Sequence, residues 1–392
     1  MTSLLGILLF VLALMLAIFL HEGGHFATAK LFGMKVERFF LGFGPTLWSF
    51  RRGETEYGVK ALPLGGFCKI AGMSPYENDA NFLEDDRASR AAAEPVPPER
   101  QFRNKPAWQR AIVLAAGSIT HFLVALLLIY VVLVAVGIGT GRATTTIEST
   151  VATTSAGRPA PARSAGLRPG DRIVAVDERP VATFDELRAA LADKAGKKVT
   201  IGYLRDGERR STTLVAASEG GHGFLGFRPI EETRRLSPLA AVPSSGRLFW
   251  DTSAAVVKGF GSFVSGLAER LQSTPGQPSG QGGGGGGDEG GPIGIVGITR
   301  IAGQAVANSQ WAIFLAILIQ LNIIVGVFNL LPLPPMDGGY LAFVGWQVLT
   351  RREVDLRKVV PVAALIIGLL VMLTVGLAWL DVTNPIPYPF SR

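Results

Sequence analysis

The sequence has few of the residues that build disulfide frameworks and thiolate metal sites, because Cys68 is its only cysteine. One cysteine excludes an intramolecular disulfide and any zinc site made of several thiolates. Charged residues are also scarce, at 18% of 392 residues, against about 25% in typical soluble domains. The histidines number four: His21, His25, His121 and His222. Any chemistry that uses imidazoles must come from these positions.

Long uncharged runs take the place of the missing charge, and 48% of the residues are hydrophobic. Four runs are close to or above the roughly 20 residues that cross a bilayer core as a helix. They are Leu4–Leu20, Ala111–Gly137, Trp311–Pro335 and Val359–Leu380. No basic residue precedes the first run, so we expect a retained span rather than a signal peptide. The pattern predicts a polytopic α-helical membrane protein with four transmembrane helices.

Basic residues near the ends of these runs account for much of the net charge of +7. They follow the first run, precede the second and follow the third, whereas the flanks of the connection between the second and third runs hold few. Because cytoplasmic loops carry the excess of lysine and arginine, residues 33–106 and 341–358 are expected in the cytoplasm. Residues 140–308 and both termini are then extracytoplasmic. This assignment leaves no support for nucleic-acid binding.

His21-Glu22-Gly23-Gly24-His25 matches the pattern H-E-x-x-H. On a helix, positions i and i+4 share a face, so both imidazoles can hold one metal ion, with Glu22 as the general base. Zn²⁺ is the natural candidate, because two imidazoles and one carboxylate leave a coordination position open. Ionisable groups are costly inside a membrane helix and usually mark function, so we prefer this interpretation to a structural cluster.

Asp337 is the expected third ligand. The first and third runs cross the membrane in the same direction, so their cytoplasmic ends can meet and bring Asp337 to His21 and His25. Prolines after the third run would break its helix, and two glycines would let the backbone turn closely. These residues are Pro332, Pro334, Pro335, Gly338 and Gly339.

H-E-x-x-H at the end of the first span, with L-N-x₆-N-L-L-P-x-P-x-x-D-G-G over Leu321–Gly339, resembles the site-2 intramembrane metalloprotease family. More narrowly, the chain is similar to the bacterial envelope-stress branch, which has one outward PDZ domain. The resemblance covers nearly the whole chain. It implies that His21, His25 and Asp337 bind zinc and that Glu22 is the catalytic glutamate.

Other segments extend the resemblance. Leu62–Phe67 is similar to the family's membrane-dipping β-loop, whose strand edge could pair with the backbone of an unwound substrate. Gly65 and Gly66 in this loop are therefore candidate substrate-binding residues. Asn322 and Asn329 match family positions that contact substrate or steady the site. The run Ser164–Asp171 looks like a PDZ core signature.

One position departs from the family pattern. The second span usually reads A-G-P-x-x-N-F, whereas Ala116–Phe122 reads A-G-S-I-T-H-F, with His121 in place of asparagine. His121 is an equivalent hydrogen-bonding group, an extra metal contact or a satisfied polar residue between helices, and we favour the first. His222 is interpreted as a surface histidine.

The resemblance implies an intramembrane zinc endopeptidase of the inner (cytoplasmic) membrane. It would cleave single-span transmembrane proteins, typically anti-sigma factors, after an upstream site-1 protease has trimmed them, in regulated intramembrane proteolysis. The alternative is a catalytically silent PDZ-bearing membrane scaffold or quality-control binder, which would need neither H-E-x-x-H nor Asp337. A metal transporter would want polar residues along several spans.

The expected fold has four transmembrane helices, a cytoplasmic-side membrane-dipping β-loop and one extracytoplasmic PDZ-like α/β domain. We expect this domain to exclude bulky substrates; recognition of the trimmed terminus is the other role. The expected segments are 1–34, first helix with H-E-x-x-H; 35–106, β-loop and flexible loop; 107–139, second helix; 143–230, PDZ domain; 231–310, juxtamembrane segment with a glycine-rich linker; 311–340, third helix with the third zinc ligand; 341–358, cytoplasmic loop; and 359–380, fourth helix.

Overall fold

The computed structural model describes residues 2–73, 95–151, 153, 159–272, 293–352 and 354–383. Most of the expected flexible loop and the whole glycine-rich linker fall on 74–94 and 273–292, which lie outside the described residues. The chain forms two compact units. Of the described residues, those up to Val131 and those from Ala241 to Thr383 build the first unit, and Val132–Ala240 builds the second.

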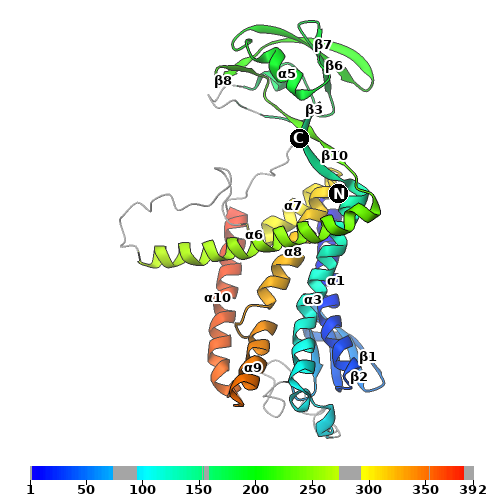
Figure 1. Ribbon diagram of the computed structural model, residues 1–392, viewed down its shortest axis with the longest axis vertical. Coiled ribbons are helices and arrows are strands. Elements are labelled where there is room, and N and C mark those ends of the chain that lie inside the picture. Colours follow the sequence, from blue (N-terminus) through cyan, green and yellow to red (C-terminus); the bar gives the residue numbers. More distant parts are fainter. Residues whose placement is uncertain are drawn as a thin grey trace. The chain divides into compact units, whose positions relative to one another are not determined.

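Four helices of the first unit are long and apolar enough to cross a membrane, which confirms the expected set (Figure 1). They are α1 (Thr2–Leu31), α3 (Ala107–Val131), α8 (Trp311–Asn329) and α10 (Leu356–Thr383), with η3 (Val132–Val136) continuing α3 as a π-helix. Helix α1 continues past Leu20, so the H-E-x-x-H motif lies within it. Helix α8 ends before the expected Pro335, because the prolines that follow Asn329 lack the N–H that a helix needs.

Shorter helices connect these four. Helix α7 (Ile295–Ala307) packs on α1, and α9 (Asp337–Thr350) packs on α3. Buried Phe10 of α1 shares a cluster with Ala302 of α7 and Phe314 of α8. The described part of the first unit also includes most of α6 (Pro238–Gln272) and two short 3₁₀ turns, η1 (Pro98–Arg100) and η2 (Phe102–Asn104).

A long hairpin, β1 (Val36–Arg52) and β2 (Thr55–Ile70), follows α1 and packs against it. Arg38–Leu41 of β1 pairs with residues 66–69 and also with residues 56–59. The 38–41 stretch is therefore central, and the described residues pair the 66–69 stretch on one side only. We call residues 66–69 the free edge.

The turn of this hairpin is anchored by an ion-pair cluster. Glu54 accepts hydrogen bonds from Lys30 of α1 at 2.5 Å and from Arg100 of η1 at 2.8 Å. The Arg100 contact, assisted by Lys30, lowers the pKa of the Glu54 carboxyl from its ordinary 4.5 to about 2. The cluster joins the last turn of α1, the hairpin turn and the segment that leads to α3.

The second unit contains a six-stranded sheet in the order β10-β3-β4-β6-β7, with β5 paired to β4, and a small β8-β9 hairpin. Its elements are β3 (Ile138–Thr150), α4 (Pro161–Ser164), β4 (Arg172–Val176), β5 (Arg179–Pro180), α5 (Phe184–Leu191), β6 (Lys198–Arg205), β7 (Glu208–Val215), β8 (Ala217–Glu219), β9 (His222–Phe224) and β10 (Phe227–Arg234). Ile173, Leu187 and Ile201 lie in its buried core. Helix α5 begins where the side chain of Thr183 accepts a hydrogen bond from the N–H of Glu186.

Candidate metal centre

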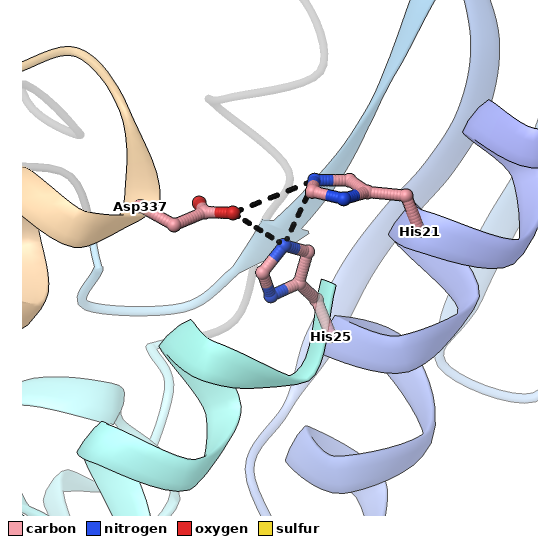
Figure 2. A group of neighbouring side chains, drawn as sticks. All are labelled: His21, His25 and Asp337. Atoms are coloured by element: carbon pink, nitrogen blue, oxygen red, sulfur yellow. Dashed lines mark hydrogen bonds and ion pairs between the residues drawn. The ribbon is translucent and has the colours of Figure 1, made fainter. Parts of the chain in front are cut away.

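Two histidines of α1 and the first residue of α9 meet at one point (Figure 2). Nε2 of His21 lies 3.3 Å from Nε2 of His25. Oδ2 of Asp337 lies 3.5 Å from the first of these atoms and 3.3 Å from the second. The three candidate ligands are thus brought together from positions more than 300 residues apart.

Local sequence explains how each ligand reaches this point. His21 and His25 are one helical turn apart and project from the same face of α1. Asp337 begins a new helix after the proline segment. A Cβ on Gly339, two residues later, would lie 2.6 Å from the nitrogen of Pro334, so only glycine lets the start of α9 pack on that segment.

The polar atoms of this triangle fit a cation at its centre. Nδ1 of His25 donates to the carbonyl oxygen of Val113 at 2.7 Å, which leaves its Nε2 as a bare acceptor in the neutral ring. Within the described chain, Oδ2 of Asp337 has no hydrogen-bond donor although it is buried. Nε2 of His25 and Oδ2 of Asp337 thus converge with Nε2 of His21 on one point, and this set of imidazole nitrogens and a carboxylate oxygen fits a metal ion.

Zinc matches the spacing. Nitrogen and oxygen ligands at about 2.0–2.1 Å in a tetrahedron lie roughly 3.3 Å apart. The separations of 3.3–3.5 Å agree with this value. Three protein ligands leave the fourth position open, which is the arrangement of catalytic zinc sites and not of structural ones.

Glu22 lies beside the centre but outside the ligand group of the described residues. The backbone of Cys68 hydrogen-bonds to its carboxylate. A Cβ on Gly66 would lie 3.1 Å from Cγ of Glu22, so the free edge runs directly past this side chain. Glu22 is therefore held between the candidate metal centre and the free edge, whose Cys68 backbone it contacts.

Two glycines that the sequence analysis did not single out shape the site. A Cβ on Gly117 of α3 would lie 2.5 Å from Cε1 of His21. A Cβ on Gly24 of α1 would lie 2.5 Å from Oγ1 of Thr120 and 2.7 Å from the carbonyl oxygen of Ala116. These glycines let α1 and α3 approach closely enough for His25 to reach Val113. In the sequence, the feature that indicates such a close helix contact is the pair of small residues Ala116-Gly117 inside an apolar run.

The other residues expected at the site lie on α3, on α8 and in the hairpin. His121 hydrogen-bonds to Asn322 at 2.9 Å, and both side chains are buried. Asn329 is the half-buried last residue of α8. Gly65 packs against the ring of Phe43. Gly66 lies next to the side chain of Glu22, since a Cβ at this position would be 3.1 Å from Cγ of Glu22.

Comparison with known proteins gives matches over most of the chain. A family model for peptidase family M50 matches residues 9–375. The zinc metalloprotease Rip1 of Mycobacterium tuberculosis is 34% identical, over 97% of this chain and 98% of that protein. The metalloprotease MmpA of Caulobacter vibrioides is 31% identical, over 96% of this chain and 94% of that protein. The PDZ domain of an SdrC-like protein from Listeria monocytogenes covers 21% of this chain and 86% of its own, at 19% identity and a TM-score of 0.18.

The family match covers well over half of the chain, and the two relatives align over almost their full lengths. The metal centre and the four apolar helices agree with these matches. The chain therefore belongs to peptidase family M50 and is a multi-pass membrane zinc metalloprotease.

Proposed function

We propose that this protein cleaves single-span transmembrane proteins within the membrane, after an upstream site-1 protease has cut them, in regulated intramembrane proteolysis. Anti-sigma factors are the proposed substrates. One observation carries the proposal: His21, Glu22 and His25 lie inside a helix long and apolar enough to span a bilayer. Polar groups inside a membrane helix cost free energy, so metal ligands at this place are expected of a protease that works within the membrane and not of a soluble one.

The residues of the chain divide the chemical work. Zinc, when bound by His21, His25 and Asp337, supplies Lewis-acid polarisation of the scissile carbonyl. Glu22 takes a proton from the attacking water and passes it to the leaving amine. The Cys68 backbone contact holds the Glu22 carboxylate at the centre.

The free edge supports a route for substrate binding. A transmembrane helix must unwind before a protease can reach its carbonyls, and its exposed N–H and C=O groups then need partners. Apart from the Cys68 group that contacts Glu22, the outer backbone groups of residues 66–69 have no strand partner among the described residues and offer this pairing. Gly65 and Gly66 carry no side chain that would block this approach. Asn329 at the end of α8 is proposed to contact the same substrate.

The proposed orientation follows from basic residues. Lys30, Arg51, Arg100 and Lys105 lie near the hairpin end of α1 and before α3, which supports a cytoplasmic location for these ends. Both termini and the second unit are then outside, in a protein of the inner membrane. The site would cut substrates near their cytoplasmic side.

The proposal is tested with Glu22→Ala in the full-length protein. We expect about one zinc per chain, as in wild type, because Glu22 is not a ligand. Cleavage should be abolished, and a truncated single-span protein should accumulate in membranes of cells that carry the variant. Glu99→Ala removes an exposed glutamate of η1 and serves as the matched control. Cleavage by Glu22→Ala at the wild-type rate would show that the mechanism is wrong.

A further inference from the structure

A third imidazole stands next to the metal centre without belonging to it. The ring centroid of His121 lies 5.0 Å from that of His21. In the described chain, the group able to share one metal ion contains His21, His25 and Asp337 but not His121. The His121 side chain is 4% exposed, so its polar atoms need partners inside the protein.

Asn322 fixes the orientation of this ring. Nδ2 of Asn322 donates to the carbonyl oxygen of Leu318, one turn earlier on α8, at 2.8 Å. The amide oxygen Oδ1 therefore faces His121, whose Nδ1 lies 2.9 Å away. An amide oxygen only accepts hydrogen bonds, so Nδ1 of His121 carries the hydrogen. In the neutral ring, Nε2 is then an acceptor.

The two residues consequently have different capacities for a ligand. Both polar atoms of Asn322 are occupied, and the residue is 3% exposed. Nε2 of His121 has no hydrogen-bond partner among the described residues. It also lies on the other side of the ring from the nitrogen that α8 holds. His121, and not Asn322, can therefore accept a hydrogen bond from a molecule in the site.

We propose that Nε2 of His121 accepts a hydrogen bond from a main-chain N–H of the substrate, and that Asn322 is a positioning residue that holds this tautomer. The inference rests on the proposed intramembrane cleavage, because an unwound substrate brings unpaired N–H groups to the site. A hydrogen bond formed away from water is electrostatically strong. An asparagine at position 121 can also accept such a bond, whereas a phenylalanine of similar shape cannot.

The tautomer is tested without any substrate. The full-length, zinc-loaded protein is labelled with ¹⁵N-histidine, and its four histidines give few signals. The signal lost in His121→Asn identifies His121. We expect the Nδ1–H tautomer in wild type and a changed nitrogen pattern in Asn322→Leu. An Nε2–H tautomer in wild type, or no change in Asn322→Leu, would overturn the assignment.

The substrate contact is tested by a double-mutant cycle of His121→Phe and Asn322→Leu. Each single variant should lower kcat/KM by roughly ten- to a hundredfold, the effect of losing one buried hydrogen bond. The double variant should be no worse than His121→Phe, because Asn322 acts through that ring. His121→Asn should recover most of the activity, and all variants should keep about one zinc per chain.

Three outcomes contradict this proposal. Multiplicative losses in the double variant would mean that Asn322 acts independently. Zinc loss in His121→Phe and also in His121→Asn would place the ring in metal binding. Equal activity of His121→Phe and wild type would remove the substrate contact. If the wild-type protein cleaves no single-span substrate while the expected tautomer is found, the proposed function fails and the pairing of His121 with Asn322 stands.

Discussion

Gly23 and Gly24 are neighbours within the H-E-x-x-H motif, yet their surroundings differ. A Cβ on Gly24 would run into Ala116 and Thr120 of α3. Apart from the backbone of its own helix, no atom of the described chain lies within 4 Å of a Cβ on Gly23. The motif therefore has one position that tolerates a side chain and one that does not.

We predict that Gly24→Ala pushes α1 away from α3 and weakens the His25–Val113 hydrogen bond that orients a ligand. Overpacking of this kind costs about 1–3 kcal/mol. Zinc content and thermal unfolding of the purified protein measure the effect. Gly23→Ala is the matched control and should keep both near wild type. Equal behaviour of the two variants would refute the role given to the helix contact.

The ligands and the glycines were not equally predictable from sequence. His21 and His25 follow from helical spacing alone, because positions four apart share a face. Asp337 needed a further premise, the common direction of the first and third spans. Gly117 was not predicted, because its importance depends on where α3 crosses α1. Hydropathy locates a helix but carries no information about its crossing point.

At the scale of elements, the hairpin β1–β2 depends on Glu54. This residue connects the hairpin turn to Lys30 and Arg100. The pKa of its carboxyl is about 2 in the folded protein, against an ordinary value of 4.5. A group with a lowered folded-state pKa stabilises the fold above its unfolded pKa, and that contribution disappears as pH falls through the folded value.

We therefore predict that the hairpin loosens as pH falls from about 4.5 toward 2. The protection of the amides of residues 51–57 against hydrogen exchange, taken relative to the intrinsic exchange rate at each pH, should fall over this range in wild type. Glu54→Gln has no carboxylate that could take up a proton over this range, so its amides should exchange faster at neutral pH and their protection should change less on acidification. The same pH response in both proteins would assign the loosening to other carboxylates.

The strand pairing within the hairpin shows a second limit of prediction from sequence. Thr55–Lys60 has the character of a strand and lies in β2. The double pairing of Arg38–Leu41 was not expected, because the identity of a strand's partners is a long-range property. The free edge, which depends on that pairing, was expected only through the family resemblance.

At the scale of the whole molecule, the second unit can be removed at a defined place. Ala143 and Glu231 are partners in the β3–β10 ladder, so the two ends left by deleting residues 143–230 start close together. The pair Gly139–Thr233 remains after the deletion and would keep the shortened strands β3 and β10 in register. A short glycine linker can close it.

We predict that this deletion permits cleavage of substrates that still carry their outer domains, because we expect the second unit to exclude bulky substrates from the site. Gel analysis of trimmed and untrimmed substrates measures the result, with zinc content as the folding control. A cavity of about 570 Å³ between α5 and residues 222–227 gives the recognition role a physical basis. Loss of cleavage of trimmed substrate, with zinc retained, would favour recognition over exclusion.

The free edge beside Glu22 has a consequence for selectivity. A strand edge offers amides and carbonyls, and every amino acid presents the same groups in return. Under the proposed function, side chains of the substrate thus matter little at this contact. Membrane segments differ in the free energy needed to unwind their helices. This free energy is lower where glycine or proline interrupts the helix. The enzyme would therefore select substrates whose transmembrane helices unwind easily, and not substrates that share a consensus sequence.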